Sequence, residues 1–270
     1  MSAILHARQV SIQFGGLKAL CEFELAIGAG ELVGLIGPNG AGKTTAFNVL
    51  TGVYQPTSGE VVVDGSVVNG LRPHKIAARG LARTFQNIRL FKELSALDNV
   101  RIACHHTTKA SWLQCLVRTP AFLREERAIT ERADGFLEVM GLGHRREELA
   151  KNLPYGEQRR LEIARALATG PKVLLLDEPA AGMNSREKVD LMELIRRIRD
   201  EFDLAILLIE HDMKLVMGVC ERIHVLDHGV MIAEGSPEQV RRNPKVIEAY
   251  LGQAPEEAAP AGAAAAAEAN

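Results

Sequence analysis

Apolar and polar positions alternate with a period of two in several parts of the chain, which predicts strands with one buried face. Residues 4–14 and 21–28 follow this pattern, and residues 59–65 form a third such strand bounded by glycines. Residues 222–235 predict a further hairpin near the end of the chain. The hairpins near the N-terminus predict an antiparallel portion of the fold.

A second set of apolar runs lacks this alternation and predicts short buried strands. They are residues 31–37, 172–179 and 204–212. Between the last two, residues 185–202 carry apolar side chains at helical spacing. Strands that alternate with helices in this way predict a parallel α/β core beside the antiparallel portion.

The strand pattern disappears from about residue 87 to residue 168, which predicts a helical lobe inserted in the α/β core. Residues 124–142 and the segment after residue 158 have the periodicity of helices. Residues 105–125 carry the single tryptophan, Trp112, and form either a helical hairpin with its own small core or a segment that faces a partner.

The predicted organisation is a single domain over residues 1–252. Its mixed-sheet core takes residues 1–86 and 169–235, its helical subdomain about 87–168, its C-terminal helical extension 236–252, and a tail follows at 253–270. The tail is rich in Ala and Glu and lacks large apolar residues, which predicts disorder. The overall composition, 47% hydrophobic and 24% charged, is typical of a soluble globular protein.

Charge and segment composition exclude several classes of function. A net charge of −2 gives no electrostatic basis for binding nucleic acid. No apolar run is long enough for a membrane-spanning helix, and residues 1–10 lack the pattern of a signal peptide. The four cysteines show no CxxC pairing and fit free thiols in a reducing compartment. We expect a soluble cytoplasmic protein that acts at a membrane only through a partner.

The strongest chemical signal is GLIGPNGAGKTT, which places the pattern G-x-x-x-x-G-K-[ST] between a buried strand and a helix. Glycines allow successive N–H groups to converge on phosphate oxygens, and the helix N-terminus adds its dipole. Lys43 supplies a cation for the β- and γ-phosphates, and Thr44 supplies a hydroxyl for Mg²⁺. The predicted phosphate-binding residues are Gly37, Pro38, Asn39, Gly40, Ala41, Gly42, Lys43, Thr44 and Thr45.

A second motif, VLLLDEP, ends a predicted buried strand with two carboxylates. Ligands of α/β sheets bind at this end of the strands. Asp177 fits the carboxylate that supports Mg²⁺ in nucleotide triphosphatases with a phosphate loop, and Glu178 is a candidate base for the attacking water. The two motifs together predict a nucleotide triphosphatase without specifying its kind.

A second loop with the outline of a phosphate-binding loop follows at residues 152–168, NLPYGEQRRLEIARALA. It resembles the signature loop of ATP-binding-cassette (ABC) ATPases, whose usual form is LSGGQ. The aligned residues are Leu153, Pro154, Tyr155, Gly156 and Glu157. The leucine and the second glycine are kept, whereas proline, tyrosine and glutamate replace serine, the first glycine and glutamine. The resemblance implies that residues 154–157 contact the γ-phosphate of ATP bound to a second subunit, and that an aspartate introduced at Gly156 would face it.

The other motifs of this family occur in the expected order, so the resemblance covers roughly residues 4–252. Gln86 matches the glutamine that contacts Mg²⁺ and the attacking water, and His211 matches the switch histidine near the γ-phosphate. Residues 180–184 resemble the loop that crosses the dimer interface, and Phe14 stands where an aromatic ring stacks on adenine. The resemblance implies an α/β fold of the phosphate-loop NTPase type, with a mixed sheet, an antiparallel β portion and an inserted α-helical subdomain.

Several details are similar to the larger ATPase subunit of branched-chain amino acid importers. They are the opening FGGLKAL, the form LPYGE, the ending GSPEQVRRNPKVIEAYLG and the long insertion around Trp112. This resemblance implies an ATP-hydrolysing motor subunit, with ATP and Mg²⁺ as its ligands, that drives import through separate membrane subunits. Related ATPases for urea or amide import, or for lipopolysaccharide export, share parts of these features and remain alternatives.

Two further hypotheses are a soluble ABC protein of translation or DNA repair and a nucleotide-binding regulatory module without turnover. A single cassette without coiled-coil or zinc insertions disfavours the first, and the presence of Glu178 and His211 disfavours the second. We therefore expect a peripheral subunit at the cytoplasmic face of the inner membrane, paired with a second ATPase subunit as a heterodimer or homodimer. Its other partners would be transmembrane permease subunits and, indirectly, a periplasmic binding protein.

Overall fold

The computed structural model describes residues 3–105 and 112–251 of the chain. At its centre lies a six-stranded sheet of order β10-β9-β3-β8-β7-β6, in which β10 and β9 are antiparallel and the other neighbours are parallel. The strands are β3 (Leu32–Ile36), β6 (Leu81–Arg83), β7 (Val173–Asp177), β8 (Ala205–Ile209), β9 (Arg222–Asp227) and β10 (Val230–Gly235). Residues 172–179 and 204–212 contain β7 and β8, which pair in parallel, and the predicted parallel part of the core is confirmed.

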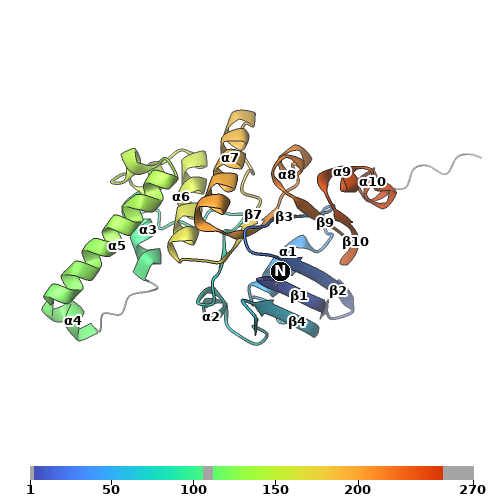
Figure 1. Ribbon diagram of the computed structural model, residues 1–270, viewed down its shortest axis with the longest axis horizontal. Helices are drawn as coiled ribbons and strands as arrows, with labels where there is room; N and C mark the ends of the chain where they lie inside the picture. The colour runs from blue at the N-terminus through green and yellow to red at the C-terminus, as the bar shows by residue number, and fades with distance from the viewer. Residues whose placement is uncertain (1–2, 106–111, 252–270) are drawn as a thin grey trace, which may run out of the picture.

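A four-stranded antiparallel sheet of order β2-β1-β4-β5 lies beside the central sheet (Figure 1). Its strands are β1 (Leu5–Phe14), β2 (Leu17–Ile27), β4 (Ser58–Val63) and β5 (Ser66–Val67). Buried positions recur along β1 and β2 because one face packs on the core, and bulges interrupt the alternation. The predicted antiparallel portion is therefore confirmed.

The helices form two groups. The core carries α1 (Lys43–Leu50), α2 (Pro73–Ala77), α7 (Ser185–Phe202), α8 (Met213–Val219), α9 (Pro237–Arg241) and α10 (Pro244–Leu251). The helical lobe consists of α3 (Ala96–Cys104), α4 (Trp112–Val117), α5 (Pro120–Val139), α6 (Tyr155–Ala168) and two 3₁₀ turns, η2 (Gly143–Arg145) and η3 (Ala150–Asn152). Figure 1 shows the lobe at one end of the longest axis and α9 and α10 at the other. None of the described helices is both long and apolar enough to cross a bilayer.

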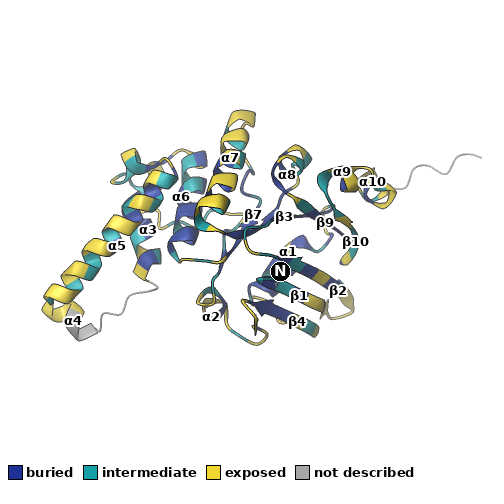
Figure 2. Cartoon of the chain, in the orientation of Figure 1, coloured by how far each residue is buried: buried dark blue, intermediate teal, exposed yellow. Residues whose placement is uncertain are grey.

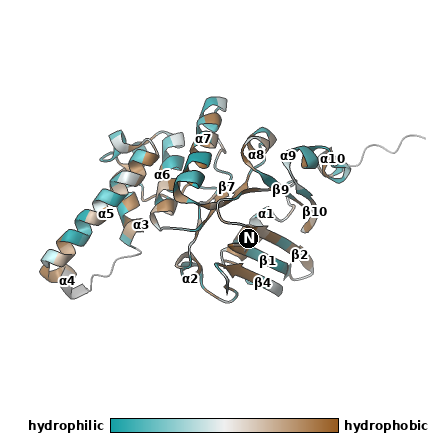
Figure 3. Ribbon diagram, viewed as in Figure 1, coloured by the Kyte–Doolittle hydropathy of each residue, from teal (hydrophilic) through white to brown (hydrophobic). Residues whose placement is uncertain are grey.

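Strands β3, β7 and β8 are buried along their whole length because layers cover both faces of the central sheet (Figure 2). Alternate residues of β3 enter different clusters: Leu32 and Ile36 pack with α6, α7 and α8, whereas Val33 and Leu35 pack with α1 and the antiparallel sheet. The strands of both sheets are correspondingly apolar, whereas the outer part of α5 is largely hydrophilic (Figure 3).

The helical segment predicted at residues 185–202 coincides with α7. The short elements β5, β6, α2 and α8 are absent from the sequence prediction. In the segment 105–125, α4 packs against α5, while residues 106–111 lie outside the described residues. The predicted tail, residues 253–270, also lies outside them, whereas α9 and α10 lie in the predicted helical extension at residues 236–252.

Candidate active site

The predicted catalytic residues come together because the strands that precede them are neighbours. Strands β3, β8 and β7 lie side by side, run parallel and therefore end at the same edge of the sheet. The phosphate loop follows β3, Asp177 ends β7, and His211 lies just beyond β8. Open α/β sheets bind their ligands at this carboxyl edge.

The phosphate loop has a backbone that accepts an anion. Gly40 and Gly42 take left-handed φ angles of 81° and 104°, and a Cβ at Gly37 would collide with the carbonyl oxygen of Leu226. Helix α1 begins at Lys43 without a side-chain cap and without an acidic residue in its first turn. The first N–H groups of the helix therefore stay available for phosphate oxygens.

Lys43 is buried in this loop and folds back along it. Its Nζ donates hydrogen bonds to the carbonyl oxygens of Gly37 at 2.7 Å and Pro38 at 2.9 Å. Burial lowers the pKa of Lys43, and the charges of Glu178 and Asp177 oppose this shift. The ammonium group thus lies on the phosphate loop, near enough to Asp177 and Glu178 for their charges to act on it.

Asp177 is held by Arg83, a residue that the sequence prediction missed. The guanidinium of Arg83 donates to Asp177 Oδ2 at 2.7 Å and to Asn48 Oδ1 at 2.7 Å, and both partners of the ion pair are largely buried. The arrangement fits Mg²⁺, because hard carboxylate and hydroxyl oxygens are its preferred ligands. Asp177 presents a fixed carboxylate, and Thr44 is exposed at the start of α1.

Glu178 contacts both of the other predicted catalytic residues, Gln86 and His211. Its Oε2 accepts a hydrogen bond from Gln86 Nε2 at 2.8 Å and lies 3.2 Å from Nε2 of His211. Both partners use the same oxygen, so Oε1 remains open for a water molecule. Glu178 also has a φ of 47°, in the left-handed region that costs free energy for a residue with a side chain. Such strain is typical of residues held in place for function.

The loop at residues 180–184 is tied to the same edge by a second residue that the sequence prediction missed. The carboxylate of Glu210 accepts a 2.7 Å hydrogen bond from Ala180 N, and burial raises the pKa of Glu210. At the other end of the loop, the side chain of Asn184 caps α7 and forms a capping box with Glu187. The two ends of this loop are therefore fixed by neighbouring elements.

The LPYGE segment differs from the loop that its resemblance implies. Pro154 is the N-cap of α6, and Tyr155, Gly156 and Glu157 form its first turn, whose first backbone hydrogen bond runs from Gln158 N to Pro154 O. The N–H groups of this turn precede that bond and have the geometry of an anion-binding helix N-terminus. The carboxylate of Glu157 lies 3.2 Å from Nε of Arg145 in the same chain.

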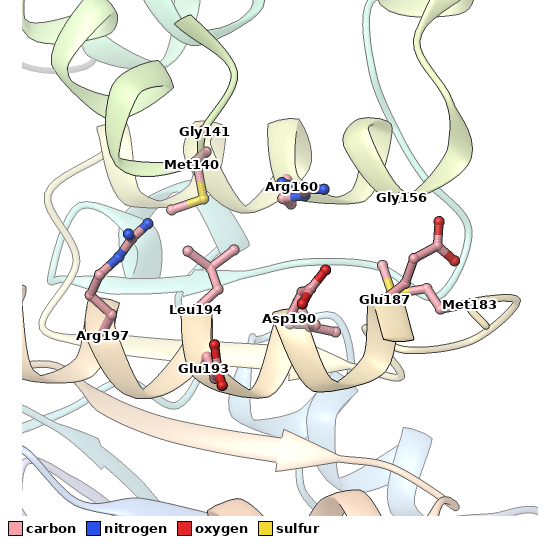
Figure 4. A pocket seen from close by; sticks show the side chains of 11 residues that line it. Met140, Gly141, Gly156, Arg160, Met183, Glu187, Asp190, Glu193, Leu194 and Arg197 are labelled. Atoms are coloured by element: carbon pink, nitrogen blue, oxygen red, sulfur yellow. The ribbon is translucent and has the colours of Figure 1, made fainter. Parts of the chain in front are cut away.

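A side chain at position 156 would point toward α7 of the same chain. The expectation that an aspartate there faces the γ-phosphate of a partner subunit stays a prediction. A Cβ added there would lie 3.2 Å from Oε1 of Glu187 in the same chain, so an aspartate would meet this carboxylate first. Figure 4 shows Glu187 reaching from α7 toward the start of α6 across a cleft of about 410 Å³. Arg160 faces this cleft from α6, and Asp190 faces it from α7 (Figure 4).

Phe14, the predicted adenine contact, lies at the end of β1 and is 45% exposed. Its ring meets that of Tyr54 edge to face, with centroids 5.1 Å apart. The pair presents an aromatic surface to solvent, and Tyr54 is a further residue that the sequence prediction missed.

Comparison with known proteins decides the family. Residues 20–181 match the family model described as ABC transporter, and residues 230–256 match the model described as branched-chain amino acid ATP-binding cassette transporter. The chain belongs to the ABC transporter family. It carries the ATPase domain of this family, and the predicted ATPase activity and fold class are thereby confirmed.

Two curated relatives match almost the whole chain. The high-affinity branched-chain amino acid transport ATP-binding protein BraF of Pseudomonas aeruginosa is 50% identical over 93% of this chain and 98% of its own length. The corresponding protein LivG of Escherichia coli strain K12 is 47% identical over the same shares of the two chains. The resemblance noted in the sequence is confirmed at the level of these relatives.

Solved structures agree with the fold. The ADP conformation of MJ1267, an ATP-binding cassette of an ABC transporter, has a TM-score of 0.81 and 30% identity, covering 94% of this chain and all of that chain. The dimeric post-hydrolysis state of the cassette MJ0796, bound to ADP and Pi, has a TM-score of 0.72 and 26% identity, covering 86% of this chain and 98% of that one. The ABC ATPase cassette described above is thus a nucleotide-binding fold.

Proposed function

We propose that this chain is the ATP-hydrolysing motor subunit of an importer for branched-chain amino acids. The observation that carries the catalytic part is Glu178, held on one oxygen by Gln86 and His211 beside a phosphate loop. The similarity to BraF and LivG over nearly the full chain supports the substrate class, and so does the C-terminal match to the branched-chain amino acid cassette model.

The chain's own residues support hydrolysis as follows. Lys43 and the N–H groups of α1 hold the β- and γ-phosphates of ATP. Glu178 accepts a proton at its open Oε1 as the water oxygen bonds to the γ-phosphorus and the bond to the β–γ bridging oxygen breaks, which yields ADP and phosphate. Gln86 and His211 keep the carboxylate in position.

Thr44, Asp177 and Gln86 are the residues that would hold Mg²⁺. When bound, this ion neutralises negative charge on the phosphate oxygens. Arg83 fixes the carboxylate of Asp177 through a buried ion pair, so that this candidate ligand is oriented before the nucleotide arrives.

A second ATPase subunit would complete each nucleotide site. The uncapped N–H groups in the first turn of α6 are suited to a γ-phosphate bound by the partner, and Pro154, which has no N–H, fits the N-cap position. In this proposal ATP closes the dimer by bridging two incomplete half-sites, and hydrolysis removes the bridge. Phe14 would stack on the adenine ring in the same half-site as Lys43.

The membrane partner would contact the groove between the core and the helical lobe. This groove of about 430 Å³ is largely apolar, and Phe85, Phe91 and Ile102 lie along it. It begins next to Gln86, so a permease segment seated there is adjacent to a catalytic side chain. The chain would then act as a peripheral subunit on the cytoplasmic side, and a periplasmic binding protein would deliver the amino acid.

Reconstitution tests this proposal. The full chain is assembled in liposomes with the transmembrane subunits and the binding protein of the proposed importer, and ATP hydrolysis and uptake of radiolabelled leucine are measured. We expect leucine to stimulate hydrolysis, and Glu178→Gln to lower turnover by about 10²–10⁴-fold while ATP binding is kept. Stimulation by urea, without stimulation by leucine, isoleucine or valine, contradicts the substrate class. Unchanged turnover in Glu178→Gln contradicts the catalytic assignment.

A further inference from the structure

Arg159 on α6 is completely buried and holds the backbone next to Gln86. Its Nη1 donates to Phe85 O at 2.6 Å, and its Nη2 donates to Gln86 O at 2.7 Å. The side chain of the same Gln86 donates to Glu178. A continuous chain of contacts therefore runs from helix α6 through one guanidinium to the candidate base.

Glu162, one turn along α6, completes this arrangement. Its Oε2 accepts from Arg159 Nη1 at 2.7 Å, and its Oε1 lies within 3.2 Å of Arg89 N and 3.5 Å of Phe85 N. The carboxylate is 5% exposed, and burial raises its pKa against the attraction of Arg159. The acid and the base of this buried pair thus bind the backbone of residues 85–89 from the same face of one helix.

Tyr155 links the same helix to the loop that follows Glu178. Its hydroxyl accepts a 3.3 Å hydrogen bond from Arg159 Nη2, and its ring packs against Gly182. A Cβ at Gly182 would lie 3.2 Å from the ring, so the contact is close. Tyr155 stands where the usual signature has its first glycine, and a glycine makes neither contact.

We propose that Tyr155 and Arg159 are positioning residues for ATP hydrolysis. They connect α6 to Gln86 and to the loop at Gly182, so that the position of α6 determines where these two parts of the site lie. This inference rests on the proposed role of Gln86. It assigns a function within one chain to Tyr155, which departs from the usual signature, and to Arg159, one turn further along α6. In this role the side chains of Arg159 and Tyr155 act through Gln86 and the loop at Gly182, whereas the contact proposed for the partner's γ-phosphate uses the backbone N–H groups of the first turn of α6.

The chemistry of the guanidinium explains why arginine occupies this position. Its planar fork makes several hydrogen bonds in fixed directions, and here they reach two consecutive carbonyl oxygens, a carboxylate and a hydroxyl. A lysine keeps the charge opposite Glu162 but offers one nitrogen on a flexible stem. Arg159→Lys therefore separates positioning of the backbone from neutralisation of the buried carboxylate.

A double-mutant cycle with Gln86→Ala tests this proposal, because residues that act through one another give non-additive effects. ATP hydrolysis by the full-length chain is followed by phosphate release over a range of MgATP concentrations, and ATP binding is measured at equilibrium. We expect Arg159→Lys to lower kcat about tenfold with an unchanged Kd for ATP, as the loss of a charge-assisted hydrogen bond predicts. In the Gln86→Ala background we expect the same substitution to change kcat less than about twofold.

Two further variants complete the design. Tyr155→Gly, which restores the usual signature residue at an exposed position, is expected to lower kcat about threefold, again only when Gln86 is present. The matched control is Arg160→Lys, the next arginine of α6, which faces the cleft of Figure 4 and is expected to leave kcat unchanged.

The outcomes separate this inference from the proposed function. Equal losses of kcat in both backgrounds, or no loss with Arg159→Lys and Tyr155→Gly, overturn the positioning role while leaving Gln86 in the mechanism. If Gln86→Ala alone leaves kcat unchanged, the proposed role of Gln86 fails, and the inference fails with it.

Discussion

Asp177 shows how a single residue of the site depends on a partner that lies 94 positions away in the chain. Arg83 neutralises its buried carboxylate, and the same guanidinium lies over the rings of Phe47 and Phe85 with centroid distances of 5.4 and 5.1 Å. A guanidinium is suited to this position because it forms an ion pair and stacks on aromatic faces at once. Arg83 therefore joins the carboxylate proposed for Mg²⁺ to the core of the molecule.

Replacing Arg83 by methionine leaves this carboxylate without its partner. Because removing one member of a buried ion pair costs about 3–5 kcal/mol, we expect Arg83→Met to lower the free energy of unfolding by that amount. The matched control is Arg8→Met, whose ion pair with Glu60 is more than half exposed and contributes less than about 1 kcal/mol. Urea denaturation measures both variants, and equal effects would contradict a structural role for the Arg83–Asp177 pair.

At the scale of helices and strands, the elements that can be predicted from the sequence are those that are long or that carry a local signal such as a capping box. Helix α7 coincides with its prediction because its amphipathic period is long and Asn184 and Glu187 form a capping box at its start. Strand β6 has three residues and β5 has two, too few for a period to be recognised. The start of α6 was missed for another reason: Gly156 and Pro154 indicate a loop, yet proline is the N-cap here and glycine lies in the first turn.

Gly156 provides a test at this scale, because the start of α6 faces α7 across the cleft. An aspartate is favourable near a helix N-terminus, but here its Cβ would lie 3.2 Å from the carboxylate of Glu187. We therefore expect Gly156→Asp to lower the free energy of unfolding by about 1–2 kcal/mol through crowding and like-charge repulsion. Equilibrium ATP binding by the monomer should stay nearly intact.

Glu187→Gln supplies the control for this prediction. The amide keeps an oxygen for the backbone N–H of Asn184 and removes the negative charge opposite position 156. Part of the lost stability should return in the double variant Gly156→Asp with Glu187→Gln, as measured by urea denaturation. Destabilisation that is identical in both backgrounds would indicate that charge repulsion with Glu187 is not its cause.

At the scale of the whole molecule, the site is assembled from segments that only the sheet topology brings together. The resemblance of short motifs predicted Gln86, Glu178 and His211 as parts of one site. In the structure the side chains of Gln86 and His211 both contact Oε2 of Glu178. Arg83, which holds Asp177, and Glu210, which holds Ala180, were not predicted. Their partners are distant in sequence, and the periodicity of a segment carries no information about such contacts.

The pH dependence of stability is a property of the same folded whole, and His224 on β9 should contribute to it. The ring is 1% exposed, neither nitrogen has a hydrogen-bond partner among the residues that the structure describes, and burial lowers its pKa to about 4. Glu234 on β10 lies 3.7 Å from Nδ1 and, with Glu31, opposes this shift, whereas Arg222 adds to it. The neutral ring is therefore the form that the fold accepts.

The direction of this pH dependence follows from the protonation of His224 in the folded and the unfolded chain. An unfolded histidine titrates near pH 6.5, so the unfolded chain binds the proton first as the pH falls, and folding loses up to about 3 kcal/mol between pH 6.5 and pH 4. Above pH 6.5 the ring is neutral in both the folded and the unfolded chain, and the penalty vanishes.

We expect His224→Leu to remove this penalty, so that the stability of the variant relative to the native chain rises progressively from pH 7 to pH 4.5 in urea denaturation. The same substitution at exposed His74 on α2 is the control and should give a pH profile parallel to that of the native chain. Parallel profiles for His224→Leu as well would show that protonation of this buried ring does not contribute to acid unfolding, and that the carboxylates alone account for it.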